Sequence, residues 1–234
     1  LLVYFLFDMN YEVEYSYYMG DIGIGPKVYE AFYVLFPKEV IQFIIMEPAD
    51  TSSTEIYYSK LPMNLKIETT RRILELLHEQ IYDHGMYCVD IKPGNFVVTY
   101  KNYFDVKMID FGVDFCSFSD EPENLGKMYK SLGKVPGFSK KDLFFVIMMI
   151  QFILFISKFP QGRELFEPFF QGNYLELFTL FLKGDAMKVL NDVKHYDSFL
   201  TYYYYNQVTE DKNGSFSQNI LNLLEHFVYD DQIL

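Results

Sequence analysis

The stretch Asp90-Ile-Lys-Pro-Gly-Asn95 and the later stretch Met108-Ile-Asp-Phe-Gly112 decide how this sequence is interpreted. The first places a carboxylate, a lysine and an amide in one short loop, which follows a predicted helix and a glycine turn. The second places another carboxylate between a predicted strand and a glycine. Each residue alone would suit a solvated loop. Both stretches in this order, joined by two short predicted strands, indicate one chemical site.

Hydrophobic patterning predicts the elements around these stretches. Ile67–Asp83 has apolar residues three and four positions apart, the pattern of an amphipathic helix, and Gly85 is expected to cap it in a left-handed conformation. β-branched and aromatic residues predict strands at Lys27–Leu35, Val40–Glu47, Phe96–Thr99 and Val106–Ile109. Further helices are predicted at Asn10–Asp21, Asp142–Lys158, Leu175–Leu182 and Gln218–Val228. Strands first and helices later predict an α+β protein.

At the two opening stretches the sequence resembles the eukaryotic-type protein kinase family. Asp90 to Asn95 is similar to the catalytic-loop pattern D-L-x-x-x-N, and Asp110-Phe-Gly112 matches the metal-binding pattern D-F-G. The resemblance implies a kinase-like bilobal fold with one domain over residues 1–234. Residues 1–47 would form an incomplete N-terminal lobe, and residues 48–234 a mainly helical C-terminal lobe.

The resemblance also implies a reaction, phosphoryl transfer from ATP with Mg²⁺ to a protein hydroxyl, which needs an aimed nucleophile and neutralised phosphate charge. Asp90 would accept the proton of the substrate hydroxyl. Lys92 would lie against the transferring phosphate, as in kinases that act on serine or threonine. Asn95 and Asp110 would hold the magnesium ions. The predicted function is therefore that of an ATP-dependent Ser/Thr protein kinase.

For the nucleotide, the resemblance points to two upstream segments. The strand before Pro48 is similar to the one that enters the kinase hinge, with Met46 as gatekeeper behind the adenine. The main chain of Glu47 and Ala49 would bond the adenine edge. Glu12 resembles the helix glutamate that pairs with a phosphate-binding lysine, and Glu14 stays open as an alternative.

The sequence also departs from the kinase pattern. Cys88 and Val89 replace the usual His-Arg before the catalytic aspartate, so activation through a phosphate bound to that arginine is not expected. Gly20–Gly25 does not fit the phosphate-covering glycine pattern, and no lysine precedes Lys27. We therefore expect a chain that lacks the first strands of its N-terminal lobe. A pseudokinase or kinase-fold binding module without turnover stays open as an alternative. The Lys-Pro pair at Lys92 disfavours a third possibility, a small-molecule kinase of the choline or aminoglycoside type.

Composition limits the class of partner. The formal net charge of −12 makes a nucleic acid an unexpected partner, because phosphate binding needs a basic face. The apolar run Leu143–Phe159 contains Gln151 and is short for a membrane span, so it is expected to be a buried core helix. Asp142, just before this run, is expected to cap the helix, to bond the catalytic-loop backbone, or both. The oligomeric state is left open.

The sequence has two cysteines, Cys88 and Cys116, with no histidine pair near them. This spacing fits neither a zinc site nor a disulfide framework. Both are therefore expected to be reduced, partly buried thiols in a cytoplasmic protein.

Overall fold

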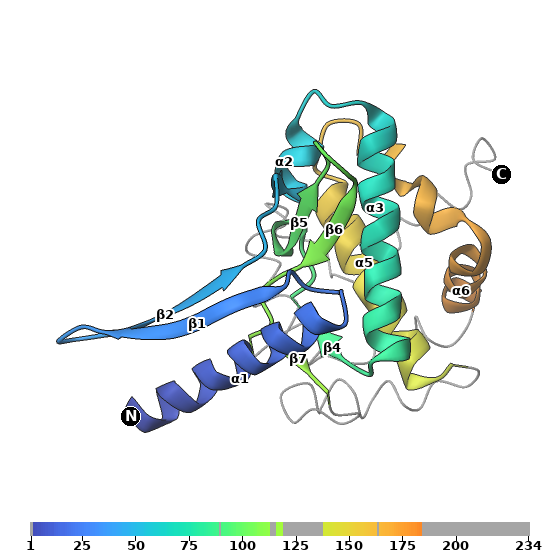
Figure 1. Ribbon diagram of the computed structural model, residues 1–234. Coiled ribbons are helices and arrows are strands. Elements are labelled where there is room, and N and C mark those ends of the chain that lie inside the picture. Colours follow the sequence, from blue (N-terminus) through green and yellow to red (C-terminus); the bar gives the residue numbers. More distant parts are fainter. Residues whose placement is uncertain (1, 89, 113–115, 119–137, 163, 184–234) are drawn as a thin grey trace, which may run out of the picture.

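The computed structural model describes residues 2–88, 90–112, 116–118, 138–162 and 164–183 (Figure 1). The helices are α1 (Leu2–Asp21), α2 (Ser53–Tyr58), α3 (Met63–His78), α5 (Lys140–Ile156) and α6 (Gly172–Lys183), with shorter helices η1 (Glu79–Asp83), η2 (Pro93–Asn95) and η4 (Glu164–Phe170). The strands are β1 (Val28–Leu35), β2 (Val40–Met46), β3 (Thr51–Ser52), β4 (Tyr87–Cys88), β5 (Phe96–Thr99), β6 (Asp105–Met108) and β7 (Cys116–Ser117). Every strand pair is antiparallel, and the predicted α+β class is confirmed.

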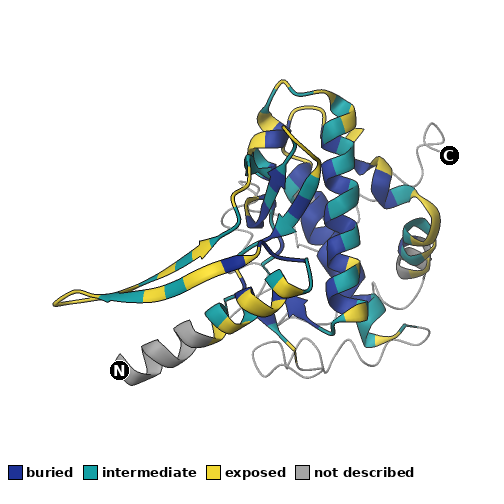
Figure 2. Cartoon of the chain, viewed as in Figure 1, coloured by how far each residue is buried: buried dark blue, intermediate teal, exposed yellow. Residues whose placement is uncertain are grey.

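Helix α5 is the centre of the hydrophobic core. Every residue from Leu143 to Ile150 is buried, and α3, η4 and α6 pack around the helix (Figure 2). A helix that is apolar all round has to be covered on all sides, so the predicted core helix is confirmed. The ring of Phe152 contacts three others, those of Tyr57, Phe96 and Phe169. No helix in the described part of the chain is long and apolar enough to cross a membrane.

The β1–β2 hairpin extends away from this core (Figure 1). Its strands pair antiparallel, with one shift of register between Val28 and Glu30, and the rings of the opposed residues Phe32 and Phe43 stack with centroids 5.2 Å apart. The two strands make up a separate two-stranded sheet. Large apolar side chains on it are exposed to solvent: Tyr29, Phe32, Leu35, Ile41, Phe43 and Ile45.

The strongly patterned elements agree with the sequence predictions. Helix α3 begins at Met63, four residues before the predicted start, and it ends in the π-helical turn η1. Gly85 follows with φ of 62°, as expected for a left-handed cap. Helix α1 begins at Leu2, well before the predicted Asn10. The helix predicted at Gln218–Val228 lies outside the described residues.

Candidate functional site

The loop from Asp90 to Asn95 is organised around the carboxylate of Asp90. The side-chain nitrogen Nδ2 of Asn95 donates to the main-chain oxygen of Asp90 (2.9 Å) and to its Oδ2 (3.0 Å). The amine of Lys92 pairs with the same Oδ2 at 2.6 Å. Asn95 is buried, and its NH₂ group is used on Asp90, so its Oδ1 is the atom able to coordinate a cation.

Helix α2 contacts this loop through Ser53. The buried hydroxyl of Ser53 donates to the carbonyl oxygen of Pro93 at 2.6 Å, across 40 residues of sequence. Pro93 opens the 3-10 turn η2, where its missing N–H costs nothing. Ser53 could not be predicted from the sequence, because its partner Pro93 lies 40 residues away and no local pattern links the two.

The β5–β6 hairpin positions Asp110 beside the Asp90–Asn95 loop. The amide of Ile109 donates to the carbonyl of Asn95 (2.8 Å), and the amide of Met108 donates to the carbonyl of Ile24 (2.9 Å). Asp110 itself has φ of 70°, in the left-handed region that aspartate tolerates better than most residues. Backbone in this region occurs often at functional positions.

Phe111 anchors the residue next to Asp110. Its ring is buried, and it lies so close to Gly25 that a Cβ added there would be 3.1 Å from the ring. The amide of Gly25 bonds the carbonyl of Met19 at 2.8 Å. The glycines of Gly20–Gly25 therefore serve a tight turn after α1 and the close approach of Phe111.

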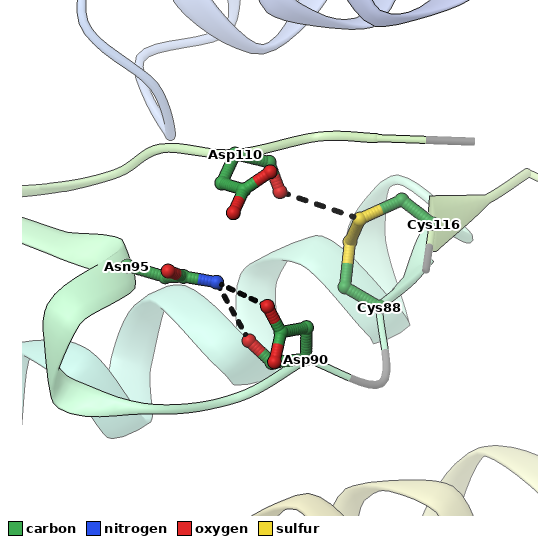
Figure 3. Close-up of a disulfide and its surroundings, with 5 residues drawn as sticks. All are labelled: Cys88, Asp90, Asn95, Asp110 and Cys116. Carbon is green, nitrogen blue, oxygen red and sulfur yellow. Dashed lines mark hydrogen bonds between the residues drawn. A yellow bond between two sulfur atoms is a disulfide. The ribbon is translucent and has the colours of Figure 1, made fainter. Parts of the chain in front are cut away.

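Asp90, Asn95 and Asp110 gather in one region (Figure 3). Although part of Asp110 is open to solvent, partial loss of hydration raises the pKa of its carboxyl, and the charge of Asp90 raises it further. Lys92 and a hydrogen bond from the amide of Gly112 oppose this rise. Two carboxylates facing one another in this way create a site that favours a cation.

Glu12 on α1 extends this acidic region. Partial burial raises the pKa of its carboxyl, and the charge of Asp110 adds to the rise. Glu14 is exposed. Of the two alternatives, Glu12 is thus the one whose charge interacts with that of Asp110. Within the described residues, Glu12 makes no ion pair.

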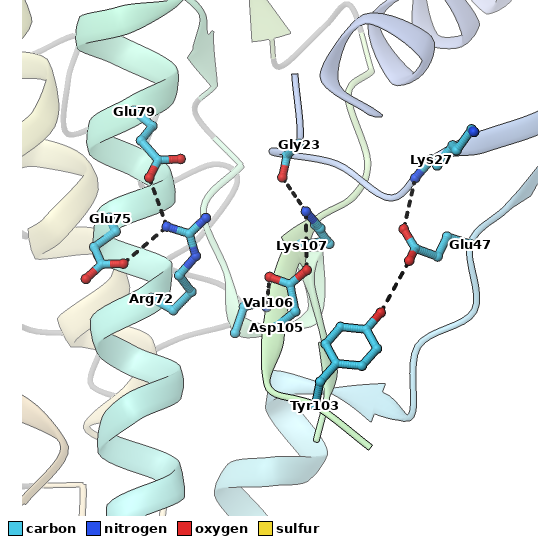
Figure 4. Close-up of polar contacts among 10 residues, drawn as sticks. All are labelled: Gly23, Lys27, Glu47, Arg72, Glu75, Glu79, Tyr103, Asp105, Val106 and Lys107. Carbon is cyan, nitrogen blue, oxygen red and sulfur yellow. Dashed lines mark hydrogen bonds and ion pairs between the residues drawn. The ribbon is translucent and has the colours of Figure 1, made fainter. Parts of the chain in front are cut away.

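The predicted nucleotide-edge residues lie apart, at the end of β2. Met46 pairs with Val28 in the hairpin, and the amide of Glu47 donates to the carbonyl of Lys27 at 2.8 Å. The Glu47 carboxylate accepts from the Lys27 amide and from the Tyr103 hydroxyl, both at 3.4 Å (Figure 4). Ala49 is exposed. No described hydrogen bond joins these residues to Asp90, Asn95 or Asp110.

Lys107, a lysine near the predicted site, is used in structural contacts. Its amine donates to the carbonyl of Gly23 (2.5 Å) and pairs with Asp105 (3.3 Å), which ties β6 to the turn after α1 (Figure 4). The same figure shows Arg72 on α3 paired with Glu75 and Glu79. These contacts direct neither the Lys107 amine nor the Arg72 guanidinium at the Asp90–Asp110 region.

The expectation of two reduced thiols is wrong. Cys88 and Cys116 form a disulfide, with their Cα atoms 4.1 Å apart (Figure 3). They face each other because β4 pairs with β7 in register. No free cysteine is left in the described chain.

Asp142 acts as a helix cap. It occupies the third position of α5 in a capping box with Ser139, and it also accepts a hydrogen bond from the Tyr82 hydroxyl. Partial burial raises the pKa of its carboxyl, but the hydrogen bonds from Ser139 and Tyr82 outweigh this, so its pKa lies below the usual value. Its described partners are therefore Ser139 and Tyr82, not the catalytic-loop backbone.

The donor set suits a hard divalent cation only in part. Asp110 and Asn95 Oδ1 offer oxygen ligands of the kind that Mg²⁺ prefers. In the described ranges, however, no cluster of three or more His, Cys, Asp or Glu side chains could hold a metal ion by itself. A magnesium ion here would need further oxygens, such as those of a nucleotide. Comparison with protein-family models found no matching family, and comparison with curated proteins found no match.

Proposed function

We propose that this chain is the catalytic region of a Ser/Thr protein kinase that transfers phosphate from Mg²⁺–ATP to a protein. One observation carries the proposal. The main-chain bond from Ile109 to Asn95 and the side-chain bonds from Asn95 to Asp90 join the two stretches that resemble the family's catalytic and metal-binding motifs. The resemblance singled out the residues of these two stretches, and the hydrogen bonds that join the stretches support the proposal.

The role of Asp90 follows from its contacts. Asn95 and Lys92 both bond Oδ2 of its carboxylate, which restricts the rotation of the side chain and keeps it at the site. A carboxylate fixed in this way orients a substrate hydroxyl and accepts its proton. Lys92 would then place positive charge beside the phosphoryl group that is being transferred.

Asn95 and Asp110 would bind the nucleotide's metal. Magnesium bound with ATP neutralises phosphate charge during the transfer. The carboxylate of Asp110 would be relieved of its repulsion with Asp90 and Glu12 by this positive charge. The resemblance assigns the adenine to Met46, Glu47 and Ala49 at the end of β2, and that assignment remains a prediction.

A binding module without turnover is the second candidate. It is favoured by Glu12, which makes no ion pair with a lysine or arginine among the described residues. Partial burial and then the charge of Asp110 raise the pKa of the Glu12 carboxyl, and no cation in the described part of the chain offsets them. Positive charge at the phosphates is a large part of phosphoryl-transfer catalysis. A protein that keeps the metal ligands but lacks this charge would bind nucleotide and turn it over poorly.

A phosphotransfer assay separates the two candidates. The chain, and the protein with any native sequence that precedes Leu1, are each tested with Mg²⁺–ATP on a generic basic protein. Asp90→Asn should lower phosphotransfer by about 10²–10⁴-fold, the usual range for general-base catalysis, and should leave ATP binding largely intact.

Asp83→Asn is the matched control, because Asp83 is an exposed aspartate on η1. It should leave transfer unchanged. ATP binding without transfer in every form of the protein would favour the binding module. Absence of ATP binding in all of them would rule out both candidates.

A further inference from the structure

We propose that the Cys88–Cys116 disulfide is a reversible covalent latch through which a dithiol reductant regulates the site. The inference deepens the proposed function and rests on it. The disulfide joins the segment that leads into Asp90 to the segment that follows Asp110. It is the one disulfide that the two cysteines of the sequence can form.

The strands that the disulfide joins are too short to hold each other firmly. β4 and β7 contribute two residues each, paired as Tyr87 with Ser117 and Cys88 with Cys116. A two-stranded pair of this size has little stability of its own in water. The covalent bond therefore adds a restraint on β7 that the strand pairing alone would not provide.

The latch reaches the site at two points. Cys88 is separated from Asp90 by a single residue. On the other side, the amide of Cys116 donates to the carbonyl of Gly112 (2.9 Å), and its sulfur lies 4.0 Å from the carbonyl oxygen of Asp110. Displacement of β7 would thus disturb the backbone that holds Asp110 in its left-handed conformation.

A third connection runs to α1. Phe118, directly after β7, places its ring edge-on against Tyr15 and Tyr18, with centroids 5.0 Å away in each pair. Both tyrosines are on the helix that carries Glu12. Closing the latch therefore positions three parts of the site together, which are the Asp90 loop, the Asp110 segment and α1.

The chemistry is ordinary thiol–disulfide exchange. A dithiol donates two electrons and two protons, the sulfur–sulfur bond breaks, two cysteine thiols form, and the dithiol becomes a disulfide. Cys88 and Cys116 are buried, so the exchange requires β7 to move away from β4. The disulfide can therefore be reduced only while β7 is displaced, and the assembled site needs β7 in place. By linkage, if the oxidised form binds Mg²⁺–ATP more tightly, bound Mg²⁺–ATP should shift the thiol–disulfide equilibrium toward the disulfide.

The composition of the chain makes the test direct. Only two cysteines are present, so the mass added by an alkylating agent counts the reduced latch without interference. Oxidised and fully reduced protein are compared in hydrogen exchange and in Mg²⁺–ATP binding. Reduction should speed amide exchange at Cys116 and Ser117 and along Tyr15–Tyr18. It should also weaken Mg²⁺–ATP binding by about tenfold, a typical size for coupling between sites.

The double variant Cys88→Ala/Cys116→Ala is the control, and reductant should change neither its exchange nor its affinity. If that variant does not fold, the comparison of oxidised and reduced wild-type protein still decides. Complete reduction that leaves exchange at Cys116, Ser117 and α1 unchanged would overturn the latch, as would tighter ATP binding after reduction. Failure of both redox forms to bind Mg²⁺–ATP is a different result, because it rejects the proposed function.

Discussion

The amide of Ile109 donates a 2.8 Å hydrogen bond to the carbonyl of Asn95, and this continues the β5–β6 ladder by one step beyond the Phe96–Met108 pair. The register of one short hairpin therefore fixes where both stretches of the candidate site lie. A slip of one residue would turn every side chain of the slipped strand to the opposite face and break this bond. Asn95 and Asp110 are placed by the geometry of a hairpin, a rigid element, although each lies just outside a strand.

Replacing Asn95 by alanine should weaken metal-dependent nucleotide binding. The change removes Oδ1 and the two bonds to Asp90, so the loss of Mg²⁺–ATP affinity should be about tenfold or more, as when a charge-assisted hydrogen bond is lost. Calorimetric titration of ATP with and without Mg²⁺ measures it. Asn102→Ala, in the exposed turn of the β5–β6 hairpin, should behave as wild type. Unchanged metal dependence in Asn95→Ala would reject Asn95 as a ligand.

The electrostatic repulsion between Glu12 and Asp110 predicts that removal of one of the two charges stabilises the fold. Without a bound cation, Glu12→Gln should raise the free energy of unfolding at pH 7 by roughly 0.5 kcal/mol, the scale of partly exposed charge pairs. Glu14→Gln, two residues away on the exposed face, should have no effect. Urea unfolding of the three proteins gives the answer, and equal stabilities would show that Glu12 does not face Asp110.

The capping box at the start of α5 predicts a loss of stability in Asp142→Asn that depends on pH. Asp142→Asn should lower the free energy of unfolding by about 1 kcal/mol at pH 7, within the range for a capping-box residue. The folded pKa of Asp142 is depressed, so its contribution is present above the pKa of the unfolded carboxyl, 3.8, and is lost as pH falls through the folded value. Thermal melts at pH 7 and pH 3 should show the difference from wild type shrinking at the lower pH. A difference that stays constant across this range would contradict the ionised cap.

The aromatic contacts of Phe152 predict a large core effect. Phe152→Ala would leave a cavity among Tyr57, Phe96 and Phe169 and should cost about 3–5 kcal/mol of stability. Leu180→Ala on α6 is the control, because Leu180 is 57% exposed and its loss should stay within about 0.5 kcal/mol. Comparable losses from both changes would mean that α5 is not the centre of the core.

Long, strongly patterned elements could be predicted from the sequence. The spacing of apolar residues in α3 and the apolar run of α5 depend only on local order, as does the left-handed Gly85. Two-residue strands such as β4 and β7 are too short to show any period. The Cys88–Cys116 pairing depends on those strands meeting, so sequence spacing alone pointed to reduced thiols.

The candidate site divides in the same way. Asp90, Asn95 and Asp110 were found because their spacing resembles a known pattern, and the hairpin between them is local. The choice between Glu12 and Glu14 required the position of Asp110 against α1, which is a tertiary contact. Ser53 was missed for the same reason, since its bond to Pro93 joins distant segments.

The β1–β2 hairpin has a consequence for how this chain behaves in solution. Among the described residues, each strand pairs only with the other, so two strand edges are open beside exposed Phe32, Ile41 and Phe43. Open edges flanked by apolar side chains recruit strands from other molecules. The net charge of −12 opposes such association through repulsion, and salt screens that repulsion. Colloidal stability of the isolated chain is therefore expected to fall as protein concentration and ionic strength rise.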